Sequence, residues 1–230
     1  MLTFLSISEL KAAINGGNII GEGGSCYVYK FLAESQIDWP SLCRIFQGVA
    51  QGIHYLHKQH IVHMDLKPGN ILLDSDMNPR IIDFELSIVL KDDEIIEDCV
   101  IGTYGYMAPE YILHAIISVK KDVYAFGAIL LQTLSAMTRS EQQPNGLFLY
   151  EWAWEALEVE RTDELFDRSL FDGSQLTEIK RFVVIGLLCV QDDREDRPMM
   201  ADVLEMLNGK EELPTPKKSA YIKSDEERSA

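Results

Sequence analysis

Four side chains suited to phosphate chemistry stand in two short polar stretches. The first stretch supplies the carboxylate of Asp65, the amine of Lys67 and the amide of Asn70, and the second supplies the carboxylate of Asp83. Phosphoryl transfer needs a carboxylate to orient the attacking hydroxyl, oxygen ligands for metal ions, and positive charge at the transferred group. These residue types therefore indicate phosphoryl transfer, with Asn70 and Asp83 as the metal ligands.

Hydrophobic periodicity predicts the elements that must hold these loops. Apolar residues recur at helical spacing behind Pro40, so residues 41–59 are expected to form a long amphipathic helix. Residues 123–134 are apolar nearly all round, as in a helix buried inside a domain. Two more helices are expected over 178–190 and 199–207, and short apolar runs at 61–62, 71–73 and 80–82 are expected to flank the polar loops.

Three motifs stand in the order of a known signature. Residues 63–70 read HMDLKPGN, residues 83–85 read DFE and residues 108–110 read APE. Asp65 and Asp83 could merely cap loops, but three motifs in this order are not expected to arise by chance. The chain resembles the protein kinases, whose signature is HRDLxxxN, DFG and APE. The resemblance implies an α+β fold with a mainly helical C-lobe, and ATP and Mg²⁺ as cofactors.

The resemblance extends to the receptor-like serine/threonine kinases of plants, near their S-domain and cysteine-rich branches. It is carried by GTYGYM at residues 102–107, DVYAFG at 122–127 and LCVQ at 188–191. It implies that Lys67 marks the serine/threonine form of the catalytic loop and that Thr103 belongs to the substrate-binding turn. It also implies a buried ion pair between Glu110 and Arg197.

The N-terminal part departs from the family pattern. Residues 21–28 resemble the glycine-rich nucleotide loop, with Cys26 in place of the third glycine; taken alone, they would equally suit a plain hairpin turn. The resemblance implies that Gly21, Gly23, Gly24 and Val28 form the remnant of the nucleotide-binding site.

Only eight residues, 31–38, then precede the long helix. The family places the ATP lysine, its glutamate partner and the hinge in this interval, and such elements need more than about 25 residues. We therefore expect an N-lobe reduced to about one β-hairpin, and weak or absent ATP binding.

Two local departures fall in the catalytic motifs. Met64 replaces the arginine that pairs with an activation-segment phosphate in the family, which implies little dependence on such phosphorylation. Glu85 replaces the glycine of DFG and costs backbone freedom where the metal-binding loop must turn. Glu85 could alternatively hold an extra cation.

These features give an expected organisation in three parts. Residues 1–38 are expected to hold a juxtamembrane-like helix and the remnant hairpin, residues 39–211 the kinase C-lobe, and residues 212–230 a mobile polar tail. A net charge of −16 argues against nucleic acid as a partner, and no apolar run is long enough to cross a bilayer. Four scattered cysteines suggest neither a disulfide framework nor a zinc site, so a cytoplasmic location without direct membrane insertion is expected.

Smaller patterns allow two interpretations each. His54, His57 and His60 lie on the long helix, where a metal site is conceivable, but the sequence offers no acidic partner and a solvated helix end is favoured. The acidic residues at 92–94 and 97–98 are most simply a solvated loop.

Three functional interpretations stay open at this level. The first is an active serine/threonine kinase acting on protein substrates. The second is a non-catalytic interaction module, a pseudokinase or decoy, that binds substrates or partner kinases through the C-lobe. The third is a truncated gene or splice product.

Overall fold

Helices form most of the computed structural model, which describes residues 38–74, 76–136, 150, 152–154, 156–157, 175–209 and 212–218. The mainly helical lobe expected from the sequence is confirmed for this part of the chain. The expected N-terminal helix and hairpin, with Gly21, Gly23, Gly24 and Val28, lie outside the described residues.

The long amphipathic helix is α3, which spans Trp39–Lys58. It begins where Asp38 accepts a hydrogen bond from the Ser41 amide at 3.0 Å, an N-cap that satisfies one free backbone N–H. Its first residue, Trp39, packs edge-on against Phe182 with ring centroids 5.0 Å apart. The sequence predicted this helix to begin two residues later, because the capping aspartate was not recognised.

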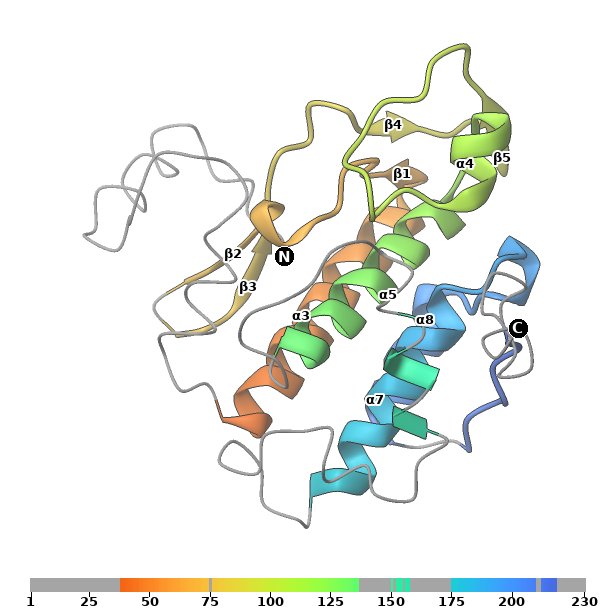
Figure 1. Cartoon of the computed structure of the whole chain (residues 1–230). Helices are drawn as coiled ribbons and strands as arrows, with labels where there is room; N and C mark the ends of the chain where they lie inside the picture. The colour runs from red at the N-terminus through yellow and green to blue at the C-terminus, as the bar shows by residue number, and fades with distance from the viewer. Residues whose placement is uncertain are drawn as a thin grey trace.

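The central helix α5 (Val119–Ala136) runs between α3 and α7 (Leu176–Cys189), as Figure 1 shows. A Cβ atom at Gly127 of α5 would lie 2.5 Å from the Cβ of Cys189, so only glycine allows the two helices to approach this closely. The last helix, α8 (Met200–Leu207), packs on α3. Apolar residues from all four helices form one core, as the apolar pattern of residues 123–134 predicted.

Short antiparallel strand pairs hold the polar loops on top of these helices. Among the described residues they are β1 (Ile61–Val62) with β4 (Ile88–Val89), β2 (Ile71–Leu73) with β3 (Pro79–Ile81), and β5 (Glu94–Ile96) with β6 (Ile116–Ser118). The remaining short elements are η1 (Pro68–Asn70), α4 (Pro109–His114) and η4 (Arg194–Asp196). The HMDLKPGN motif therefore connects β1 to β2, and APE opens α4.

Two segments differ from the sequence-based expectation. The acidic residues at 92–94 and 97–98 are exposed, as expected, but Glu94 begins β5 and lies 2.6 Å from Arg194, so this part is a paired strand and not a loop. Residues 212–218, the start of the expected mobile tail, contact the domain: the Lys217 amide donates to Gln191 Oε1 at 2.9 Å. A sequence scan cannot detect this contact because polar residues on both sides make it.

Within the described part of the chain, no helix is both long enough and apolar enough to cross a bilayer.

Candidate active site

Asp65 lies at the centre of a small polar cluster. Lys67 Nζ donates to its Oδ2 at 2.6 Å, and the Thr103 hydroxyl donates to its Oδ1 at 2.7 Å. Lys67 Nζ also donates to Thr103 Oγ1 at 3.1 Å, which closes a triangle of hydrogen bonds. The catalytic loop and the substrate turn, 38 residues apart in sequence, are thereby joined at one carboxylate.

Asn70 completes the cluster from η1. Its Nδ2 donates to the main-chain oxygen of Asp65 at 2.8 Å and more weakly to the carboxylate at 3.3 Å. Both amide hydrogens are used in this way, which leaves the Oδ1 oxygen of Asn70 for a ligand. The tight 3-10 turn that follows Lys67 produces this orientation.

The Asp65 carboxylate is held in its charged form. Burial raises the pKa of Asp65, but the hydrogen bonds from Lys67 and Thr103 and the charge of Lys67 outweigh burial, so the net pKa lies below its usual value. Asp65 is therefore ionised near neutral pH, the state in which it accepts a hydrogen bond from a hydroxyl.

Asp83 directly follows a residue whose backbone contacts the catalytic loop. The Ile82 amide donates to the main-chain oxygen of Asn70 at 3.0 Å, and Nε2 of buried His63 lies 2.9 Å from the Ile82 carbonyl. A carbonyl can only accept, so His63 carries its proton on Nε2. Within the described part of the chain no hydrogen bond occupies the exposed Asp83 carboxylate.

The oxygen atoms left open in this cluster suit a hard divalent cation. Mg²⁺ prefers carboxylate and carbonyl oxygens, and within the described residues neither the Asp83 carboxylate nor the amide oxygen of Asn70 takes part in a hydrogen bond. Among the described residues no group of three His, Cys, Asp or Glu side chains is close enough to form a metal site by itself. These two ligands would therefore need oxygens from a phosphate or water to complete the metal's coordination.

The residues that depart from the family motifs adopt well-defined conformations. Met64 has a positive φ of 75° and is 5% exposed, packed in an apolar cluster. Its buried partners in that cluster are Val62, Leu90, Tyr111 and Ile117. In the DFE motif the left-handed residue is Asp83, with φ 65°, and Glu85 needs no positive φ in this conformation.

Sequence reasoning missed the role of Asp122, which it treated only as part of the buried helix. This carboxylate is 1% exposed and accepts hydrogen bonds from the amides of His63 at 2.8 Å and Met64 at 3.2 Å. His57 Nε2 lies 3.2 Å away, so the expectation that His57 belongs to a solvated helix end was wrong. The available signal was an aspartate in the first turn of an otherwise apolar helix, where burial demands a partner.

The pKa of Asp122 is also shifted by its surroundings. Burial raises this pKa. The opposite effect is larger and comes from the hydrogen bond and charge of His57, the charge of Lys121 and the hydrogen bond from the His63 amide, so the net pKa is below its usual value. The main chain just before Asp65 is therefore fixed by a buried, charged carboxylate.

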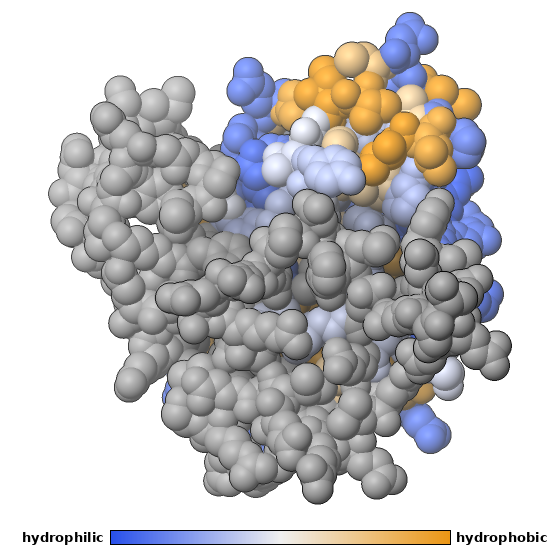
Figure 2. Space-filling view, viewed as in Figure 1, coloured by the Kyte–Doolittle hydropathy of each residue, from blue (hydrophilic) through white to orange (hydrophobic). Residues whose placement is uncertain are grey.

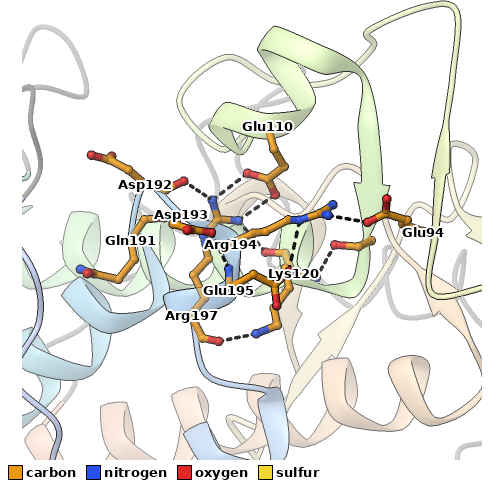
Figure 3. Close-up of polar contacts among 10 residues, drawn as sticks. Glu94, Glu110, Lys120, Gln191, Asp192, Asp193, Arg194, Glu195 and Arg197 are labelled. Carbon is orange, nitrogen blue, oxygen red and sulfur yellow. Dashed lines mark hydrogen bonds and ion pairs between the residues drawn. The ribbon is translucent and has the colours of Figure 1, made fainter.

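Glu110 and Arg197 form the buried ion pair that was expected. Arg197 contacts both oxygens of Glu110, at 2.8 and 2.7 Å, and its side chain is fully buried. Its other N–H groups donate to the main-chain oxygens of Gln191, Lys120 and Asp192, so all five donors are bonded (Figure 3). The pair ties α4 to the loop before α8.

Comparison with known proteins agrees with this geometry. The protein kinase domain family matches residues 22–207. A G-type lectin S-receptor-like serine/threonine-protein kinase of Arabidopsis thaliana is 40% identical over 81% of this chain, and cysteine-rich receptor-like protein kinase 19 of the same plant is 41% identical over 79%. The chain spans only 23% and 29% of these two relatives.

The match covers well over half of the chain and includes the HMDLKPGN, DFE and APE motifs. The chain therefore belongs to the protein kinase family and resembles the receptor-like serine/threonine kinases of plants within it.

Proposed function

We propose that this chain holds the protein-acceptor half of a serine/threonine kinase site, in which Asp65 orients the hydroxyl of a protein substrate. The observation that carries the proposal is the 2.7 Å hydrogen bond from the Thr103 hydroxyl to the Asp65 carboxylate. A substrate serine or threonine would make the same kind of contact, from an aliphatic hydroxyl to a charged carboxylate.

The neighbouring residues take complementary roles in this proposal. Lys67, 2.6 Å from Asp65, steadies the transferred phosphoryl group, while Asn70 and Asp83 hold Mg²⁺. The metal, when bound, neutralises charge on the phosphates. Thr103 helps to position the substrate segment, and the Glu110–Arg197 pair keeps α4 in place beneath it.

We further propose that ATP handling is severely impaired. The eight residues at 31–38 cannot hold the strands, helix and hinge that the family uses to bind ATP. Phosphoryl transfer depends on positioning and electrostatics, and loss of one preorganised donor costs on the order of 100- to 1000-fold in turnover. Loss of a lysine, its partner and the adenine contacts together should bring transfer below detection.

A radiolabelled-phosphate assay on the purified full chain tests this proposal. We expect no incorporation into a general serine/threonine substrate above that of Asp65→Asn. Thermal shift with ATP, with and without Mg²⁺, is expected to show little stabilisation. Incorporation that disappears in Asp65→Asn would contradict the proposed impairment and support an active enzyme.

The setting proposed for this lobe follows from the family. We infer that it works on the cytoplasmic side with protein substrates, and that any membrane association comes through a partner or a further segment. Fractionation of cells expressing the full chain with a C-terminal tag tests the location. Recovery in the membrane pellet after a high-salt wash would contradict a purely cytoplasmic location.

A second candidate function is binding of a protein partner, and one surface feature favours it. Figure 2 shows an apolar area over the part of the molecule where Figure 1 places β4, β5 and α4. The large apolar side chains exposed on these elements and on the loop between β5 and α4 are Val89, Ile96, Val100, Ile101, Tyr104, Ile112 and Leu113. A patch of this kind often marks an interaction site.

The charges beside this apolar patch indicate the chemistry of the partner. Asp92, Asp93, Glu97 and Asp98 are exposed in the same segment, against one exposed lysine, Lys91. Acidic side chains around an apolar surface favour a basic segment with apolar side chains, by charge complementarity. We therefore propose a basic, apolar protein segment as the occupant.

Fluorescence anisotropy with a labelled peptide of alternating lysine and leucine tests this second function. Binding is expected to weaken with salt and to fall about tenfold in Ile96→Ser/Leu113→Ser. Tyr55→Ser, which removes an exposed aromatic ring on α3, is the matched control. Equal binding of a glutamate–leucine peptide, or an equal loss in the control, would contradict the proposal.

A further inference from the structure

Lys121, in the first turn of α5, is a buried cation whose amine binds a main-chain carbonyl. The residue is 2% exposed, and its Nζ donates to the main-chain oxygen of Met64. The amine lies 4.7 Å from the ring centroid of Tyr111, within cation–π range. Among the described residues it forms no ion pair at salt-bridge distance, although such burial is unfavourable for a lysine.

The carbonyl that Lys121 binds belongs to the peptide immediately before Asp65. Met64 has a positive φ of 75°, a conformation that surrounding contacts must hold. Asp122 fixes the amide side of this residue at 3.2 Å, and Lys121 fixes its carbonyl side. The orientation of Asp65 thus depends on two neighbouring residues of α5.

Tyr111 extends the same set of contacts to the activation segment. Its hydroxyl accepts from the Ile101 amide at 2.8 Å and donates to the Ile101 carbonyl at 3.0 Å. The Ile101 side chain is 52% exposed, so hydrogen bonding to Tyr111, and not apolar packing, fixes this part of the backbone. Two residues later, the Thr103 hydroxyl reaches Asp65.

Gly102, between these two contacts, passes beside the same Met64 carbonyl. It has φ 152°, and a Cβ atom there would lie 3.7 Å from the Met64 oxygen and 3.2 Å from Met107 Sδ. The catalytic loop, α4, α5 and the activation segment therefore meet at one carbonyl and one tyrosine ring.

We propose that Lys121, acting together with Tyr111, is a positioning residue that locks the activation segment onto the catalytic loop. Lys121 holds the peptide before Asp65, and Tyr111 holds the backbone before Thr103, so the two partners of the Asp65–Thr103 hydrogen bond are set by one contact pair. The lock uses the charge of a lysine on α5 and needs no phosphate. It rests on the proposed function only in treating Asp65 as the catalytic carboxylate.

The alternative is that Lys121 contributes to stability alone, and two variants of the full chain separate the possibilities. In Lys121→Met we expect little change in melting temperature, because removal of a buried charge without a salt-bridge partner offsets the loss of the hydrogen bond to the Met64 carbonyl. The Ile101 amide should nevertheless exchange with solvent roughly tenfold faster, and the methyl NMR signal of Thr103 should shift.

Tyr111→Phe keeps the ring and removes only the hydroxyl, so it should move the Thr103 signal in the same direction. The effect of Lys121→Met/Tyr111→Phe on that signal should be smaller than the sum of the single effects, since both act through one contact pair. Lys120→Met is the control: its Nζ donates to the Arg197 carbonyl, so it should leave Ile101 exchange unchanged.

Unchanged Ile101 exchange in Lys121→Met, or a Thr103 signal that neither variant moves, would overturn the proposal. A fall in melting temperature with Ile101 exchange rising only in proportion would assign Lys121 a purely structural role. Should Lys121→Met fail to fold, the Thr103 signal in Tyr111→Phe still decides. None of these readouts measures phosphoryl transfer, so an inactive chain does not affect the result.

Discussion

Two regions of the molecule join carboxylates to cations: the Arg197 anchor, which is the ion pair of Arg197 with Glu110, and the Asp65 cluster, which contains Asp65, Lys67, Thr103 and Asn70. They differ in how many of their polar groups remain available to a ligand. At the anchor every N–H of Arg197 has an acceptor, and its side chain has no exposed surface. In the cluster the Lys67 and Asp65 side chains are 20% and 11% exposed, and the Asp83 carboxylate of the DFE motif is exposed and free of hydrogen bonds within the described residues.

This difference separates groups that stabilise the lobe from groups that can bind a ligand. A buried charge with all its partners present holds distant segments together, and its loss leaves the partners unsatisfied. An exposed carboxylate without a protein partner contributes little to stability and remains available for a cation. We therefore expect substitutions to affect stability at the anchor and chemistry at the cluster.

Arg197→Ala should have the largest effect on stability. It leaves the Glu110 carboxylate buried without its partner and frees three main-chain oxygens, which should cost about 3–5 kcal/mol. Urea denaturation followed by circular dichroism measures this loss. Arg194→Met, which removes ion pairs to the exposed side chains of Glu94 and Glu195, is the control and should cost less than about 1 kcal/mol. Equal losses in the two variants would remove the distinction.

Asp122→Asn should have the next largest effect on stability, a loss of about 2–3 kcal/mol near neutral pH. The substitution removes one of the two oxygens that accept from backbone amides, and it removes the negative charge beside His57. The folded pKa of Asp122 is lowered, so its contribution is fully present above the usual value of 3.8 and is lost as pH falls through the folded pKa. The difference from the native chain should therefore shrink below pH 3.8. A difference that grows in acid would contradict the assigned shift.

Gly127→Ala tests whether the position of α7 matters to the anchor. The added Cβ would meet Cys189 Cβ at 2.5 Å and Val190 at 2.8 Å, just before Gln191, which accepts from Arg197. Overpacking of this kind should cost about 2 kcal/mol, read from the urea midpoint. Gly105→Ala lacks any such neighbour and tests backbone strain alone, since Gly105 has φ 93°. A smaller loss in Gly127→Ala than in Gly105→Ala would show that helix packing is not limiting.

Asp83→Asn should have the smallest effect on stability, within about 0.5 kcal/mol, because the carboxylate is exposed and unpaired within the described residues. Differential scanning calorimetry without metal checks this value. A loss comparable to that of Asp122→Asn would mean that Asp83 belongs to the scaffold, which would remove it as a metal ligand.

The sequence predicted the elements of this lobe that have a regular hydrophobic spacing or a recognisable motif. Helical spacing located α3, α5, α7 and α8 to within a few residues, since apolar side chains must face the shared core. Motif order placed Asp65, Lys67 and Asn70 on one loop. Side-chain contacts between segments far apart were beyond pattern reasoning, because they depend on how the elements pack.

His57, Lys121 and Tyr111 illustrate that limit. Of the three, only His57 falls in a helix predicted from the sequence, and the partner of each lies on another element: Asp122 for His57, the Met64 carbonyl for Lys121 and Ile101 for Tyr111. A polar residue inside an apolar helical pattern indicates that it has a polar partner on another element. The sequence pattern does not identify that partner.

A chimera tests the central claim most directly. The interval between Lys30 and Trp39 is replaced by the corresponding interval of the Arabidopsis G-type lectin S-receptor-like kinase that is 40% identical, and phosphate transfer to a protein substrate is measured for both chains. The account predicts no transfer by the native chain, transfer by the chimera, and none by the chimera carrying Asp65→Asn. A folded, ATP-binding chimera that still transfers no phosphate would contradict the claim that the Asp65 cluster is competent.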